Sequence, residues 1–212
     1  MSFLQSYTHL VDFSQKSLLL SACAIAFNPT AWNIVARKEY RTRFLTKFFG
    51  SGQAACYFLA ISIFSLGLVR DFLYERALRA QPSHQLLEGT IPTFAGYALL
   101  ACGNILVISS TWQLGITGTF LGDYCGILMD DIVTGFPFNI TNAPMYYGST
   151  MSFLGTALLY GKPAGILITA EVLLVYLIAI QYENPFTAGI YAKREQERAK
   201  AGGKKVEEKK EL

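Results

Sequence analysis

Charged residues and histidines are scarce in this chain, and their scarcity excludes several kinds of chemistry. Asp, Glu, Lys and Arg make up only 16% of the 212 residues, and the two histidines, His9 and His84, stand alone in polar surroundings. The sequence holds no Ser–His–Asp set, no HExxH motif, no glycine-rich phosphate loop and no Rossmann fingerprint. We therefore do not expect either histidine to act as a catalytic base.

Cysteines are also few, and their spacing is not that of a metal site. The four cysteines lie in apolar or glycine-rich segments, at Cys23, Cys56, Cys102 and Cys125. Disulfide frameworks and zinc sites both show closely and regularly spaced cysteines, so we expect neither here, and no metal. Cys102 and Cys125 are better explained as packing residues than as nucleophiles.

Apolar residues, by contrast, are abundant. They form 52% of the chain, and the mean hydropathy is +0.32, which is too apolar for an ordinary soluble domain. The net charge of +3 is concentrated in short basic clusters, which are more typical of contacts with lipid headgroups than with nucleic acid. No cleavable signal peptide is recognisable, so insertion would rely on internal apolar segments.

The apolar runs predict an all-α integral membrane protein without a Rossmann domain. The first run, Ser17–Ala36, contains Pro29, so it could be a kinked span or a re-entrant intramembrane segment, and we favour the re-entrant segment. We expect about three to four transmembrane helices after it. The three clearest runs are Gln53–Val69, Pro92–Gln113 and Ala164–Ile180.

We expect one membrane-embedded domain over residues 1–192 and a charged tail over 193–212 that begins helical and ends disordered. If the tail is cytoplasmic, three crossings put Arg70–Thr90 in the cytoplasm and Gly115–Tyr160 on the far side. The basic segment Arg37–Lys47 then also lies on the far side, against the positive-inside rule. Lys209 and Lys210 resemble a dilysine retrieval signal of endoplasmic reticulum membrane proteins, although a lysine-rich tail explains them equally well.

The stretch Gly115–Met151 is the most unusual part of the chain, because it is polar and glycine-rich between apolar segments. Carboxylates such as Asp123 and Asp130 are costly at membrane depth unless they line a cavity or take part in chemistry. Glycines recur every four residues, at Gly118, Gly122 and Gly126. They fit closely packed helices and a cofactor pocket equally well.

Four segments, taken together and in this order, resemble the phospholipid methyltransferase family. They are GTFLGDYCGILMDD, VTGFPFNI, NAPMYYGST and YENPFTAGIY, and the similarity covers roughly Ser109–Lys193. The resemblance implies N-methylation of phospholipid headgroups, from phosphatidyl-N-methylethanolamine through the dimethyl lipid to phosphatidylcholine. The first methylation, from phosphatidylethanolamine, stays open.

The resemblance also implies S-adenosyl-L-methionine as methyl donor, bound within the helical membrane domain. A Gly-x-Gly motif of the family falls on Ala101, Cys102 and Gly103, and a Glu-Glu pair falls on Glu183 and Asn184. This chain departs from the family pattern at Ala101, which adds a methyl group, and at Asn184, which removes a charge. We still expect all five positions to form the cofactor site.

Methyl transfer to an amine requires the nitrogen to lose its proton, and a carboxylate or a tyrosine can accept it. The catalytic candidates are Asp123 and Tyr146, with Tyr124 and Glu183 beside them. The basic segment Arg37–Lys47 could hold the lipid phosphate or could serve only as an interfacial anchor.

Two alternatives remain. An isoprenylcysteine carboxyl methyltransferase-like enzyme would carry Arg-His before the proline at Pro144, where this chain has Asn142 and Ala143. A non-enzymatic membrane scaffold would leave Asp123 and Glu183 without a purpose. The expected partners are a phospholipid in the bilayer and a second copy of the chain, with no nucleic acid. We expect the endoplasmic reticulum membrane, with a cytoplasmic tail, and a mitochondrial membrane as a second location.

Overall fold

The computed structural model describes residues 10–130 and 133–208, with side chains through residue 200. All regular structure in these residues is helical, and four helices, α2, α4, α5 and α7, are long and apolar enough to cross a membrane. This confirms the predicted all-α membrane class. The elements are α2 (Lys16–Thr42), α3 (Phe44–Phe49), α4 (Gly52–Ala80), η1 (Gln85–Leu87), α5 (Thr90–Thr119), α6 (Pro144–Leu159) and α7 (Pro163–Glu208).

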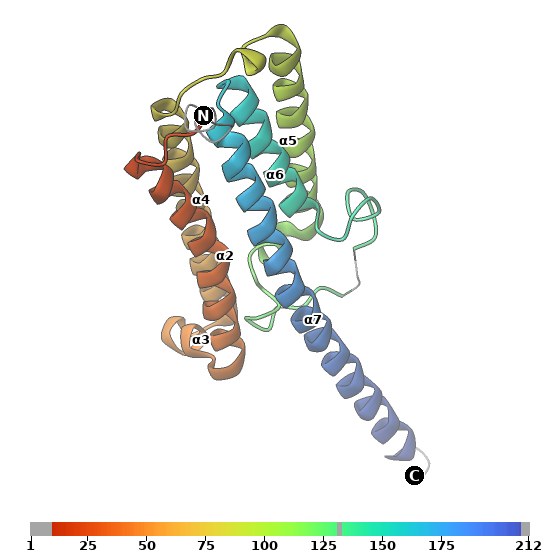
Figure 1. The fold of residues 1–212 in the computed structure, drawn as a ribbon. Helices are drawn as coiled ribbons and strands as arrows, with labels where there is room; N and C mark the ends of the chain where they lie inside the picture. The colour runs from red at the N-terminus through yellow and green to blue at the C-terminus, as the bar shows by residue number, and fades with distance from the viewer. Residues whose placement is uncertain (1–9, 131–132, 209–212) are drawn as a thin grey trace.

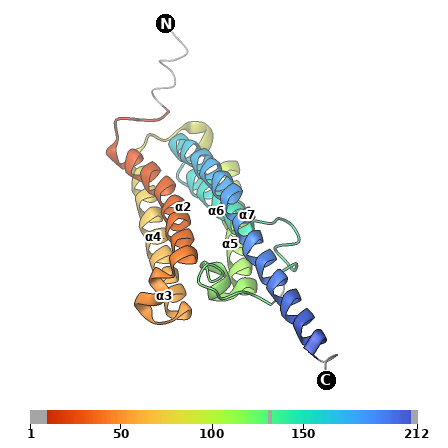
Figure 2. The same ribbon diagram turned by 90° about the horizontal axis from the view of Figure 1, so that it is seen from below.

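The helices form two neighbouring groups (Figures 1 and 2). Helix α2 packs along α4, and α6 lies between α5 and α7, while α2 also contacts α7. Between the groups lies a buried core that draws on α2, α4, α6 and α7, with Leu18, Tyr74, Phe153 and Val172 among its members. The far end of α7 extends beyond the bundle toward the C-terminus.

The preference for a re-entrant segment at Ser17–Ala36 is wrong, because α2 is one continuous helix through Pro29. A proline removes a single backbone donor, and membrane helices tolerate that loss when neighbouring helices hold the segment on both sides. Here Ile25 is buried in the core, and the Asn28 side chain donates a hydrogen bond to the Leu66 carbonyl of α4 at 3.2 Å.

Other helices continue past the ends of their apolar runs. Helix α4 extends beyond Val69, where Arg70 donates to the Tyr176 hydroxyl of α7 at 2.7 Å and pairs with Asp71 at 2.8 Å. A charge within a membrane helix is tolerable when it is paired in this way.

Helix α7 continues through Pro185 to Glu208, so the expected helical start of the tail is present. Lys209 and Lys210 lie outside the described residues.

Helix α6 changes the predicted topology. It has 16 residues and runs back along α5, so the chain returns across the bundle before α7 begins. The start of the tail, residues 120–130 and 133–143, and the basic segment Arg37–Lys47 therefore lie at the same end of the bundle. The expectation that Gly115–Tyr160 lies opposite the tail is wrong. Arg37–Lys47 thus shares the side of the tail, as the positive-inside rule favours, whereas Arg70–Thr90, which we expected on the side of the tail, lies at the opposite end of the bundle.

Two pairs of glycines bring α5 and α6 into close contact. A β-carbon on Gly103 would lie 2.5 Å from the Gly148 carbonyl oxygen, and one on Gly155 would lie 2.7 Å from the Gly96 carbonyl oxygen. Both pairs recur after seven residues, which is two helical turns, so they lie on one face of each helix. Small residues at this interface allow the two backbones to approach closely.

The turn between α2 and α3 is held by a buried carboxylate. Glu39 is completely buried, and it accepts hydrogen bonds from the Leu45 amide at 2.6 Å and from the Thr46 amide and hydroxyl. These are amide groups at the start of α3, which have no partner within the helix itself. The residue at the turn, Arg43, is left-handed with φ 54°, and its guanidinium donates to the Tyr124 carbonyl at 3.2 Å.

The glycine contact predicts unequal effects of two similar substitutions. Gly155→Ala should destabilise the protein by about 1–3 kcal/mol, because the added methyl group collides with α5. Gly67→Ala on α4, where no atom lies within 4 Å, should leave stability unchanged or raise it by up to about 1 kcal/mol. Thermal unfolding in detergent micelles compares them, and equal melting temperatures would contradict the close packing of α5 and α6.

Candidate functional site

The Glu183 carboxylate of α7 is held by donors from two other helices. Its Oε2 accepts a hydrogen bond from the Tyr146 hydroxyl of α6 at 2.5 Å, and its Oε1 accepts one from the Asn33 amide of α2 at 2.7 Å. A buried charge is tolerable only when it is hydrogen-bonded, and here each oxygen has one donor. The carboxylate thus lies where α2, α6 and α7 meet.

A second carboxylate lies one turn further along α7. The Thr187 hydroxyl donates to Asp123 Oδ2 at 3.1 Å, and Thr187 follows Glu183 by four residues, so both carboxylates lie near one face of α7. Burial raises the pKa of Asp123, and the hydrogen bonds from Thr187 and the Tyr124 amide only partly oppose it. The two acidic groups give this region the character of a site for cations.

Aromatic rings stand beside these carboxylates. Tyr124 stacks on Phe186 with 5.2 Å between ring centroids and 9° between planes, and the Arg37 guanidinium lies 4.6 Å from the centroid of Phe186. Burial raises the pKa of Tyr124 to about 12, so this phenol stays protonated at neutral pH. Tyr146 meets Tyr176 edge to face at 4.8 Å. Aromatic faces next to carboxylates suit a flat or positively charged ligand.

The segment that carries Asp123 and Tyr124 is fastened to α7. The Met129 amide donates to the Tyr191 hydroxyl at 3.3 Å, and Arg194 donates to the carbonyls of Met129 and Asp130. Arg43 holds the same segment from the other side through the Tyr124 carbonyl. The start of the charged tail therefore contributes to the site, which the sequence did not indicate.

Several buried polar atoms near these groups have no hydrogen-bond partner among the described residues. One of them is Asn33 Oδ1. The Tyr124 hydroxyl has Thr187 beside it but makes no hydrogen bond of ordinary geometry. Buried polar atoms are rarely left unpaired, so these atoms mark places where a bound molecule can donate or accept.

The predicted site residues fall into two separate groups. Tyr146 and Glu183 are hydrogen-bonded to each other, and Asp123 is held by Thr187 one turn away. Gly103 instead packs against Gly148 on α6, and its neighbours Ala101 and Cys102 are exposed on α5. Residues Tyr146 and Gly148 are two apart and point to nearly opposite sides of α6, so α6 separates Gly103 from Glu183. Asn184 is exposed on α7.

Asn33 is the residue of this cluster that sequence reasoning missed. It lies on α2, 150 positions before Glu183, and its hydrogen bond depends on how two distant helices pack. An asparagine inside an apolar run was the only available signal, and Asn28 gives the same signal five residues earlier.

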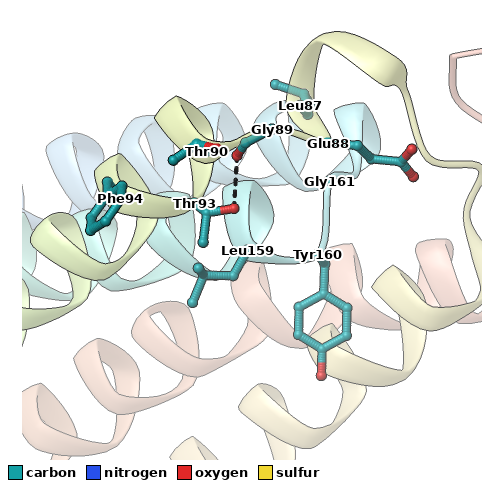
Figure 3. Close-up of a pocket in the computed structure, with 9 residues that line it drawn as sticks. All are labelled: Leu87, Glu88, Gly89, Thr90, Thr93, Phe94, Leu159, Tyr160 and Gly161. Atoms are coloured by element: carbon teal, nitrogen blue, oxygen red, sulfur yellow. Dashed lines mark hydrogen bonds between the residues drawn. The ribbon is translucent and has the colours of Figure 1, made fainter.

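A cavity of about 530 Å³ lies between the start of α5 and the end of α6 (Figure 3). Glu88, Thr93 and Tyr160 are among its lining residues, and the Thr93 hydroxyl donates to the Gly89 carbonyl at 2.8 Å. Tyr160 follows Tyr146 by 14 residues on α6, which separates them by about 20 Å along the helix. The cavity is therefore distinct from the cluster around Glu183.

Comparison with known proteins adds an independent finding. The sequence model of the family described as phospholipid methyltransferase matches residues 91–194. A Neurospora crassa protein named phosphatidyl-N-methylethanolamine N-methyltransferase is 76% identical over 196 residues, which cover 92% of this chain and 92% of that protein. A Saccharomyces cerevisiae protein of the same name is 54% identical, over 91% of this chain and 94% of its own length.

Similarity extends to animals. A Mus musculus protein named phosphatidylethanolamine N-methyltransferase is 45% identical over 194 residues, covering 92% of this chain and 96% of that protein. No solved structure matches the chain.

The buried Asp123 carboxyl predicts a pH-dependent effect of its neutral isostere. Its pKa is raised in the folded state above the ordinary value of about 4, so charge on Asp123 opposes folding at pH 8. Asp123→Asn should therefore melt at a higher temperature than the wild type at pH 8. The difference should shrink as the pH falls through the raised pKa toward the ordinary value of about 4, because the folded wild type takes up a proton before the unfolded chain does.

Thermal unfolding in detergent between about pH 4 and 8 measures this difference. Asp130→Asn is the control, because it neutralises an exposed carboxylate in the same segment. A melting difference for Asp123→Asn that does not depend on pH would contradict the assignment.

Proposed function

Because this chain belongs to the phospholipid methyltransferase family, we propose that it methylates the amine headgroup of membrane phospholipids, from phosphatidyl-N-methylethanolamine to phosphatidylcholine. The observation that carries this proposal is the likeness to fungal proteins of that name over nine-tenths of each chain. Similar proteins named for phosphatidylethanolamine extend the proposal to the first methylation as well. An isoprenylcysteine methyltransferase and a non-enzymatic scaffold have no such support.

The methyl donor is S-adenosyl-L-methionine, which supplies an electrophilic methyl group on a sulfonium cation. The cluster around Glu183 fits this molecule chemically. Its carboxylates, Glu183 and Asp123, attract the positive charges of the donor, and the stacked rings of Tyr124 and Phe186 offer a face to a cation or a flat base. The unpaired Asn33 Oδ1 offers an acceptor to an ammonium or a ribose hydroxyl.

The contributions of Ala101, Cys102, Gly103 and Asn184 to donor binding stay predictions. Gly103 has a second explanation in this chain, because its contact with Gly148 holds α6 against α5. That contact supports the donor site indirectly, since α6 also carries Tyr146.

Proton removal from the substrate amine is assigned to Tyr146 and Glu183. An ammonium has no lone pair, so it must lose a proton before its nitrogen can attack a methyl carbon. The Tyr146 hydroxyl already donates to Glu183 Oε2, so its oxygen can accept the amine proton as its own proton passes to the carboxylate. Asp123, the second catalytic candidate, lies in the segment between α5 and α6, beside Thr187 of α7, where its carboxylate can attract the positive charges of the donor and of the headgroup.

The end of the bundle that carries Glu183 is assigned to the cytoplasm. The basic residues of α2 and α3 lie at that end together with the tail, and basic residues favour the cytoplasmic side. Arg37 and Arg43 donate to the carbonyls of Tyr182 and Tyr124, so these two arginines hold α2 to α7 and to the segment that carries Asp123. Location in the endoplasmic reticulum or a mitochondrial membrane stays a prediction, as does self-association.

The activity is tested with purified protein, labelled S-adenosyl-L-methionine and vesicles that contain one acceptor at a time. Label should appear in the products of the monomethyl and dimethyl lipids, and the phosphatidylethanolamine arm reports on the first step. S-adenosyl-L-methionine alone should also raise the melting temperature, because it binds only the folded chain. Absence of both effects with every acceptor would overturn the proposal.

Tyr146 offers a sharper test of the proton path. Tyr146→Phe removes the hydroxyl beside Glu183 and should lower kcat by about a hundredfold or more, the usual contribution of a positioned acid or base. Tyr147→Phe, at the next position and exposed, should retain most of the activity. If both variants methylate the monomethyl lipid at similar rates, Tyr146 has no part in proton removal.

A further inference from the structure

We propose that Asn33 is a positioning residue for Glu183, which it holds in the orientation that binds the positively charged part of the methyl donor. The proposal rests on the proposed function of the same site and names a residue of α2 that belongs to neither of the matched sequence motifs. Its basis is the geometry of three side chains from three helices.

The first observation is that the Glu183 carboxylate is held at both oxygens. Tyr146 donates to Oε2 and Asn33 donates to Oε1, so neither oxygen is free to turn away. With Tyr146 alone, the carboxylate could pivot about its one remaining hydrogen bond. Two donors on opposite oxygens fix the plane of the group, and the lone pairs left over point in set directions.

The second observation is that the Asn33 amide has only one acceptable orientation. Its Nδ2 donates to Glu183 at 2.7 Å and also to the Pro29 carbonyl at 3.0 Å, one turn earlier on α2. Exchange of the amide oxygen and nitrogen would place an acceptor against two acceptors. Asn33 is therefore itself fixed by its own helix, which a positioning residue must be.

The third observation is that Asn33 Oδ1 is buried without a partner among the described residues. The amide carbon bears both Oδ1 and the nitrogen that holds Glu183, so this acceptor lies a short distance from the carboxylate. Because a buried acceptor without a donor costs free energy, the arrangement is understandable if a bound ligand supplies the donor. The ammonium and ribose hydroxyls of S-adenosyl-L-methionine are such donors.

The alternative explanation is that Asn33 only stabilises the packing of the helices. Another asparagine of α2, Asn28, shows what such a residue looks like. Asn28 lies five residues earlier, is buried, and donates to the Leu66 carbonyl of α4 at 3.2 Å. That bond joins two helices without touching a charged group. Asn28 is therefore a matched control, since its substitution removes the same amide from the same helix and leaves Glu183 unaffected.

The experiment measures the dissociation constant for S-adenosyl-L-methionine by equilibrium binding to protein in nanodiscs. The variants are Asn33→Leu, Asn28→Leu, Glu183→Gln and the double variant Asn33→Leu/Glu183→Gln. Asn33→Leu should weaken binding about tenfold or more, as expected for a lost hydrogen bond to a charged group, and Asn28→Leu less than about twofold. Melting temperatures show whether each variant is folded.

The double variant separates positioning from packing. If Asn33 acts through the Glu183 charge, then Asn33→Leu should weaken binding less than about threefold once Glu183→Gln is present, because neutral hydrogen bonds are weaker. The proposal would be overturned if the fold-changes in dissociation constant caused by Asn33→Leu and Glu183→Gln multiplied in the double variant. Equal losses of affinity for Asn33→Leu and Asn28→Leu would also overturn it. Should Asn33→Leu not fold, Asn33→Ala removes the donor without adding bulk or charge and should weaken binding to a similar extent.

Failure of this inference is distinguishable from failure of the proposed function. If the wild type neither binds S-adenosyl-L-methionine nor methylates any lipid, the function itself is wrong. If the wild type does both while Asn33 and Glu183 act independently, only the assignment of Asn33 fails.

Discussion

The need to keep a carboxylate hydrogen-bonded in apolar surroundings governs much of this structure. Glu183 lies on a helix that crosses the bundle, and a charge there requires donors that only other helices can supply. Asn33 of α2 and Tyr146 of α6 supply these donors. The same constraint appears at Glu39, whose donors are the first amides of α3, and at Arg70, which pairs with α7. Each buried charge thereby fixes the position of one helix relative to another.

Helix α6 connects two kinds of contact that would otherwise be unrelated. One side of it is joined to α5 by Gly148 and Gly155, where backbones touch. Its other side carries Tyr146, whose hydroxyl must come within hydrogen-bond distance of Glu183. Since glycine contacts leave little freedom to shift, the position of the phenol is set by packing on the opposite face. Substitutions at the glycines would therefore reach the carboxylate without touching it.

The long spans could be predicted from the sequence because apolar composition alone distinguishes a membrane helix. Helix α6 could not, since its 16 residues fall short of the roughly 20 that mark a membrane span. Missing it reversed the expected side of Gly115–Tyr160 relative to the tail. Tyr146 and Glu183 were found through their motifs. Asn33 was not, because its importance arises from the packing of α2 on α7, and in the sequence it cannot be distinguished from Asn28.

The shortness of α6 affects the depth in the membrane at which the water-soluble methyl donor and the phospholipid headgroup could come together. Its 16 residues rise about 24 Å, whereas the hydrocarbon core of a bilayer is about 30 Å thick. Either the bilayer thins around α6, or the chain at one of its ends lies a few ångströms below the membrane surface. Asp123 and Tyr124 belong to the segment that leads into α6. A water-soluble donor and a lipid headgroup would then each have only a shallow descent to make from the membrane surface. The rate of methyl transfer should therefore depend on bilayer thickness, because the thickness sets how far the site lies below the membrane surface.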